Sequence, residues 1–160
     1  MSIEYNHKGI KIDAEVEMKL IDYRDKGGNY RTRFDRNLKV GVKFWEFSIN
    51  NNLTELAFVK STLSYFMQLF WKRTSKEDSK IDLVKIIHRD YPNKGRLSLY
   101  FVARQKNKKH FLQICLQRGD ETVNESYLDG QEVVMLDIAI GKAIGLLTPT
   151  TIIIGHEKQY

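Results

Sequence analysis

The stretch KVGVKFWEF, from Lys39 to Phe47, decides the predicted fold because two kinds of side chain alternate along it. Successive side chains of a β-strand point to opposite faces of the sheet. One face would carry the apolar side chains of Val40, Val42 and Phe44. The other face would carry two lysines and two large aromatic rings, namely Lys39, Lys43, Trp45 and Phe47. The pattern predicts a sheet with one face in a core and an opposite face that is open, basic and aromatic.

The residues before this stretch extend the strand pattern. Apolar and charged residues alternate from Ile10 to Leu20, which is typical of a half-buried strand. The sequence DKGGN at 25–29 then supplies the glycines of a hairpin turn. We expect the chain to return in one strand from Tyr30 to near Ile49, where three asparagines interrupt it.

A helix follows each group of strands. After Asn52 the apolar period changes to about 3.6 residues, and Glu55 completes a capping box with that asparagine. Asp129 and Glu132 repeat this spacing at the start of a second helix, which Pro149 keeps from continuing. The second group of strands is predicted at 81–89, 96–104, 111–118 and, more weakly, 122–128.

Two groups of strands, each followed by a helix, predict an α+β fold. We expect two repeats of antiparallel β-strands followed by an α-helix, with curved sheets and helices packed on one face of each sheet. A single domain over 1–160 would contain half-repeats at about 8–73 and 80–148, and a C-terminal tail at 149–160. The sequence RTSKEDSK at 73–80 is the predicted linker.

Composition narrows the possible functions. The 160 residues carry a net charge of +6, which favours polyanionic partners, although a basic surface can also be merely solvated. Cys115 is the only cysteine, so no disulfide can form within the chain, and this fits a reducing compartment. The N-terminus has no apolar run of signal-peptide length, and no segment of the sequence is apolar over the roughly 20 residues of a membrane span. We therefore expect a cytoplasmic protein without a membrane partner.

Signals of enzymatic activity are weak. The four histidines are scattered without metal-ligand spacing, and no paired-carboxylate or phosphate-loop motif is present. Cys115 lies between Ile114 and Leu116 in a predicted strand, which suits a packed thiol better than a nucleophile. We expect a protein that is not an enzyme and that uses no cofactor and no metal.

The predicted open faces combine cations with aromatic rings. Cations neutralise phosphates, and aromatic planes offer stacking surfaces to unpaired bases. The candidate nucleic-acid-binding residues are Tyr30, Arg31, Arg33, Arg36, Lys39, Lys43, Trp45, Phe47, Arg96, Tyr100, Arg104, Lys106, Lys108, Lys109, Phe111 and Gln113. They predict sequence-tolerant binding of single-stranded DNA or RNA, with DNA favoured. Alternatively, Trp45 and Phe47 could pack in a core or a subunit interface, as in a structural protein whose aromatic faces bury against partner chains.

The repeated order of strands and helix, with a basic and aromatic free face, resembles the superfamily of the Whirly proteins, PUR-alpha and the mitochondrial guide-RNA-binding proteins. The strongest local likeness is QEVVMLDIAIGKAIGLL, from Gln131 to Leu147, which is similar to the C-terminal Whirly helix in its acidic start, apolar stripe and small residues. The resemblance implies single-strand binding across the sheets and a homo-oligomer, a dimer or tetramer, formed through the helices. Large apolar residues at Phe66, Met67, Phe70 and Trp71 also favour an oligomer.

Overall fold

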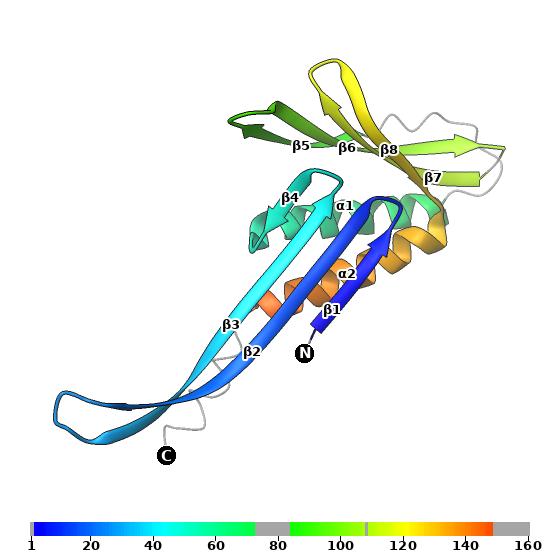
Figure 1. Cartoon of the computed structure of the whole chain (residues 1–160). Coiled ribbons are helices and arrows are strands. Elements are labelled where there is room, and N and C mark those ends of the chain that lie inside the picture. Colours follow the sequence, from blue (N-terminus) through cyan, green and yellow to red (C-terminus); the bar gives the residue numbers. More distant parts are fainter. Residues whose placement is uncertain (1, 73–83, 108, 149–160) are drawn as a thin grey trace.

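The computed structural model describes residues 2–72, 84–107 and 109–148 (Figure 1). The first half contains β1 (Ser2–His7), β2 (Ile10–Arg24), β3 (Tyr30–Phe44), β4 (Phe47–Asn50) and α1 (Leu53–Lys72). The second half contains β5 (Val84–Tyr91), β6 (Gly95–Lys106), β7 (Lys109–Arg118), β8 (Glu121–Leu128) and α2 (Gly130–Leu147). Each half forms a four-stranded antiparallel sheet in which spatial order follows chain order. The predicted α+β fold class is confirmed, whereas the predicted linker and C-terminal tail lie outside the described residues.

The first sheet differs from the prediction at both ends. Its first strand is β1, which the sequence analysis did not identify. The strand predicted from Tyr30 to Ile49 is two strands, because the chain reverses between Phe44 and Phe47, which pair with each other. Trp45 occupies this two-residue turn with a φ of 56°. Because the turn reverses the chain, Phe44 and Phe47 point to the same face, and both are buried.

The two helices pack against each other, and each contacts the sheet of the other half. Helix α1, which follows the first sheet, contacts the second, since Glu55 pairs with Arg89 of β5 and Phe70 stacks on His110 of β7 at 5.7 Å. Helix α2 packs against β1, β2 and β3 of the first sheet, against β7 and β8 of the second sheet, and against α1. Both predicted capping residues are confirmed, because the Asn52 and Asp129 side chains accept hydrogen bonds from the backbone amides of Glu55 and Glu132 at 3.1 and 2.8 Å.

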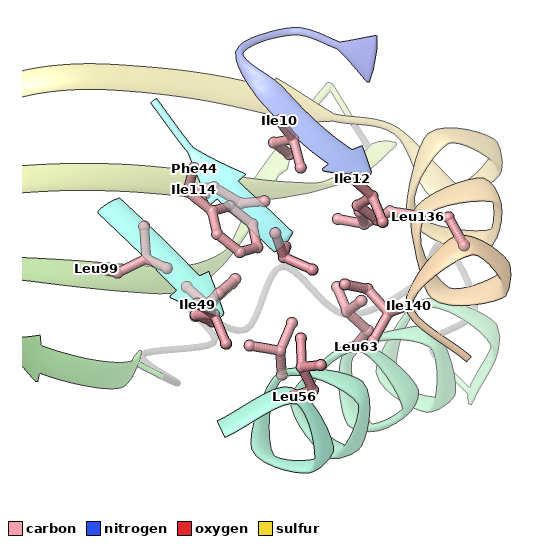
Figure 2. Close-up of a cluster of buried hydrophobic side chains, with 14 of the residues drawn as sticks. Ile10, Ile12, Phe44, Ile49, Leu56, Leu63, Leu99, Ile114, Leu136 and Ile140 are labelled. Atoms are coloured by element: carbon pink, nitrogen blue, oxygen red, sulfur yellow. The ribbon is translucent and has the colours of Figure 1, made fainter. Parts of the chain in front are cut away.

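One apolar cluster unites both sheets and both helices. Figure 2 shows Ile12 and Ile49 of the first sheet near Leu63 of α1 and Ile140 of α2, with Leu99 of the second sheet at the side. These side chains are fully buried. Complete burial of a large aliphatic side chain contributes about 1.5–3 kcal/mol, so this cluster holds the two halves in a fixed relation.

The β2–β3 hairpin continues beyond this core as a two-stranded arm (Figure 1). Ala14 and Val40 are buried, but Met18 and Leu20, on the same face of β2, are 64% and 62% exposed. The predicted alternation of β2 is therefore correct. Its apolar face is covered only over the half of the strand that lies near the helices.

Candidate nucleic-acid interface

The outer face of the first sheet carries lysines but no excess of positive charge. Lys39 and Lys43 are exposed on it, as predicted. On the neighbouring strand β2, Lys43 faces Lys11 and Lys39 faces Glu15, followed on the same face by Glu17. Alternating charges of both signs attract a polyanion weakly, so this face is a poor candidate for binding phosphates.

Phe47 and Trp45 do not lie on this open face, and the structure instead shows the alternative of packing with the core. Phe47 is fully buried in the core, with the Arg89 guanidinium carbon 5.0 Å from its ring centroid. Trp45 is partly buried, and its indole lies so close to Gly9 that a Cβ there would be 2.0 Å from Nε1. The physical reason is the turn at Trp45, which reverses the direction of every following side chain.

The next turn residue explains why the reversal is stable. The Glu46 carboxylate accepts a hydrogen bond from Arg118 Nη2 at 3.2 Å and forms an ion pair with Lys94 Nζ at 3.3 Å. Both partners belong to the second sheet and its turns. The Tyr91 hydroxyl accepts a hydrogen bond at 3.2 Å from the Ser48 amide. The β3–β4 turn is therefore fastened to the second sheet and does not offer its aromatic residue to a ligand.

The predicted basic residues at the start of β3 lie at the tip of the arm. Tyr30 is 76% exposed and has the Arg24 guanidinium over its ring at 4.6 Å. Arg31 pairs with Asp25 at 3.1 Å, and Arg33 pairs with Asp35 at 3.2 Å. Hydrogen bonds from the Asn29 backbone, then from Arg31, lower the pKa of Asp25.

These ion pairs neutralise much of the positive charge at the tip of the arm. Arg36 is a further predicted contact, but its side chain is not among those that the structure describes. The arm is therefore a weaker candidate than its sequence indicates.

The outer face of the second sheet brings the other predicted residues together. Arg104 of β6 faces Phe111 of β7, and Lys106 faces Lys109 at the turn that joins these strands. Tyr127 of β8 faces Gln113, two residues beyond Phe111, and is 48% exposed. We name this group the outer patch: Arg104, Lys106, Lys109, Phe111 and Tyr127.

The outer patch can bind a single strand in two ways. Its three cations are exposed, whereas Phe111 is half-buried and Tyr127 exposed. Cations release counterions from phosphates, and each aromatic plane can stack a base for about 1–3 kcal/mol. Tyr100, a further predicted residue, is half-buried on the same face, four residues from Arg104 along β6.

Gln113 has a different role from the predicted one. It is only 8% exposed, and its Oε1 accepts from Arg104 Nε at 2.9 Å while its Nε2 donates to Glu125 at 3.1 Å. Both polar atoms of its amide are thus engaged within the protein. Gln113 fixes Arg104 in place and has little capacity to contact a ligand.

Arg96 lies at the opposite end of this face from the outer patch. Its guanidinium bonds Asp90, with Nε donating at 2.9 Å, and this hydrogen bond and charge lower the pKa of the carboxyl. A phosphate would have to compete with Asp90 for this cation. Lys108, also predicted as a contact, lies outside the described residues.

The sequence analysis missed Tyr127 and the neighbouring β1–β2 turn, which contains Lys8. The pattern of β8 is weak, so it did not show which of its residues face outward. Lys8, in the β1–β2 turn, donates to the Tyr127 carbonyl at 2.9 Å and to Glu132 Oε1 at 3.0 Å. Contacts between residues so far apart in the chain leave no signal in local periodicity.

Glu132 connects the two halves beside the outer patch. Its carboxylate accepts hydrogen bonds from His7, from Lys8 and from the Asp129 amide. Burial alone would raise the pKa of this group, but the hydrogen bonds from His7, Lys8 and the Asp129 backbone outweigh it and lower the pKa to about 2. Glu132 is therefore a fixed anion and anchors Lys8 next to β8.

The described part of the chain contains no cluster of three or more histidine, cysteine or acidic side chains placed to hold a metal ion. Cys115 is 6% exposed in β7, consistent with the packed thiol that was predicted. In the same part of the chain, neither helix has the length and apolar character needed to cross a membrane.

Known structures resemble this fold over almost the whole chain. WHY1 from Arabidopsis thaliana is 11% identical, with a TM-score of 0.39, over 92% of this chain and 90% of its own. WHY3 from Arabidopsis thaliana is 10% identical, with a TM-score of 0.41, over 99% and 95% of the two chains. The plant transcriptional regulator PBF-2 is 12% identical, with a TM-score of 0.37, over 92% and 89%.

These three are Whirly proteins, which belong to the superfamily that the sequence resembles. No protein-family model matches the sequence, and no curated protein is similar to it in sequence.

Proposed function

We propose that this chain binds single-stranded DNA, with little sequence preference, across the outer face of the β5–β8 sheet. The observation that carries the proposal is the outer patch, where Arg104, Lys106 and Lys109 surround the rings of Phe111 and Tyr127 on one accessible surface. Stacking on these rings requires base faces that are free, and a duplex keeps its base faces covered. Single strands are therefore expected to bind more tightly than duplexes.

Polar side chains on this face do not favour RNA. Ser98 is hydrogen-bonded to His88 at 2.7 Å, and Gln113 is engaged by Arg104 and Glu125. A protein that distinguishes RNA needs free hydrogen-bonding groups for the 2′-hydroxyl. Ser98 and Gln113 are therefore not free to bond a ribose hydroxyl, and DNA is the favoured ligand.

The test is a fluorescence anisotropy titration at two salt concentrations. The ligands are labelled oligothymidine, oligouridine of equal length and a duplex. Oligothymidine should bind most tightly and should lose affinity steeply as salt rises, because counterions are released from the phosphates. Equal affinity for the duplex, or no binding at low salt, would show that the outer patch has another role.

We also propose that the chain forms a homo-oligomer through its helices. Phe66 is fully buried within the chain, and Met67 and Phe70 are partly buried, so these residues contribute less free apolar surface than the sequence indicates. On α1, however, Phe58 and Tyr65 are 38% and 39% exposed two turns apart on the same face of the helix. Exposed apolar residues at such spacing suit a helix interface. Light scattering should give a mass of a dimer or larger, and a mass near 18.8 kDa would contradict this.

This helix surface also supports the alternative function of an interaction protein that buries its apolar faces against partner chains. That alternative predicts oligomer formation without nucleic-acid binding. The titration and the mass measurement together distinguish the two functions.

A further inference from the structure

A hollow lies beside the outer patch, between the edge strand β1 and the first turns of α2. Its volume is about 280 Å³, and it is lined by Tyr5, His7, Gln131, Glu132 and Met135. Sites for whole small molecules usually measure about 300–1,000 Å³. A hollow at the lower end of this range suits one planar group better than a larger ligand.

The walls of the hollow combine flat apolar surfaces with polar groups. The rings of Tyr5 and His7 meet edge to face with centroids 6.4 Å apart, and the Met135 side chain is 58% exposed. The Tyr5 hydroxyl oxygen is buried and has no hydrogen-bond partner among the described residues. A buried polar atom without a partner costs about 1–3 kcal/mol, so a ligand that bonded it would gain affinity.

Two groups in the hollow can recognise a ligand through either kind of hydrogen bond. Burial, followed by the charge of Glu132, raises the pKa of Tyr5, so its hydroxyl keeps its proton and can donate as well as accept. Gln131 is exposed, and its amide also donates and accepts. Glu132 accepts three hydrogen bonds, from His7, Lys8 and the Asp129 amide, and acts as a support for the site.

Lys8 lies between the hollow and Tyr127 of the outer patch. Lys8 contacts both Glu132, which lines the hollow, and the Tyr127 carbonyl at the edge of the second sheet. The Ser126 hydroxyl donates to the Lys8 carbonyl at 2.7 Å, which fixes this junction from the other side. Neighbouring strands are about 4.8 Å apart, so a nucleic acid crossing from Arg104 to Tyr127 covers about 10 Å before it reaches Lys8.

We propose that the hollow takes one unstacked base of the single strand that crosses the outer patch. This inference rests on the proposed single-strand binding and adds a second, enclosed contact to it. The base would lie against Met135 and the Tyr5 and His7 rings, with its edge bonded to the Tyr5 hydroxyl and the Gln131 amide. Because both groups donate and accept, purines and pyrimidines fit alike.

The experiment compares one filling variant with a matched control. Met135→Trp places a large ring in the hollow from an exposed position, so the fold should persist. Ile138→Trp makes the same change one turn along α2, outside the hollow. Affinity is measured for oligothymidines of about 4 to 16 nucleotides, the range of single-strand site sizes.

Met135→Trp should weaken binding of the longer oligomers about fivefold to tenfold, the loss expected for one base contact, and leave the shortest oligomers unaffected. Ile138→Trp should bind all lengths like the wild type. Tyr5→Phe, which removes only the hydroxyl, should also weaken binding of the longer oligomers without lowering the thermal midpoint.

A second readout locates the base directly. Oligothymidines carrying 2-aminopurine at one position each are bound to the wild-type protein, and acrylamide quenching is measured. One position should be better protected from acrylamide than its neighbours, and Tyr5→Phe should reduce that protection.

The outcomes separate this inference from the proposed function. If Met135→Trp and Ile138→Trp both bind every length like the wild type, and no 2-aminopurine is selectively protected, the hollow holds no base although the outer patch still binds the strand. If the wild type binds no single strand at low salt, the proposed function fails and this inference fails with it.

Discussion

Replacing Phe111 with leucine should weaken binding of single-stranded DNA while leaving the fold nearly intact. Phe111 is half-buried on the outer face of β7, opposite Arg104. Leucine keeps an apolar side chain that covers the sheet but removes the aromatic plane on which a base would stack. The variant therefore separates a stacking role from a packing role.

The expected magnitude follows from the exposure of the ring. Stacking of a base on a freely available aromatic side chain is worth about 1–3 kcal/mol. The sheet already covers part of the Phe111 ring, so we expect the lower part of this range, about 1–2 kcal/mol. This corresponds to a dissociation constant raised about fivefold to thirtyfold, since about 1.4 kcal/mol is a factor of ten.

The assay is anisotropy with labelled oligothymidine, together with urea unfolding of the same samples. Phe70→Leu is the matched control, because Phe70 is also half-buried but faces the core, where it stacks on His110. Phe70→Leu should lower the free energy of unfolding and leave the affinity unchanged. Unchanged affinity in Phe111→Leu, or a loss that only follows unfolding, would refute base stacking on this face.

The remaining predictions test other parts of the structure. Phe47→Ala should cost about 3–5 kcal/mol of the free energy of unfolding, because a fully buried ring is removed, and urea unfolding measures this loss. Lys106→Ala and Lys109→Ala should each reduce the slope of log affinity against log salt for single-strand binding by about 0.7. Arg96→Ala should change this slope less, because the Arg96 charge is paired with Asp90. Because the pKa of Glu132 is lowered to about 2 in the folded protein from 4.5, this group stabilises the fold above about pH 4.5, and the contribution falls as pH drops toward 2. Glu132→Gln should therefore lose about 1–3 kcal/mol of stability at pH 7 but almost nothing near pH 2, and an equal loss at both values would contradict the ion-pair account.

The order of elements could be read from the sequence because it depends on local patterns. The alternation from Ile10 to Leu20, the change to a helical period after Asn52 and the repeated cap at Asp129 are each set by residues close together in the chain. These patterns predicted the two strand groups and both helices. β1 was missed, because the segment SIEYNH is short and its alternation includes only two apolar residues, Ile3 and Tyr5.

The candidate site could be predicted only in part, for a reason that Phe47 illustrates. Period-two alternation assigns faces correctly only while a strand continues, and a two-residue reversal at Trp45 and Glu46 inverts every later assignment. Neither residue is a usual hairpin-turn residue, so nothing local announced the turn. In β6 and β7, which contain no such reversal, Arg104 and Phe111 were placed correctly on the same face.

Local sequence by itself determined the two strand groups, the helices, their caps and the excess of basic residues. Only the tertiary structure decided which basic residues remain available to a ligand, because ion pairs at Arg31, Arg33 and Arg96 neutralise some of them while Lys106 and Lys109 stay exposed. It also decided that Lys8 and Tyr127, 119 positions apart, lie side by side. Periodicity indicates which way a side chain points within its own element. Neighbours across the fold are set by how two sheets and two helices share one core.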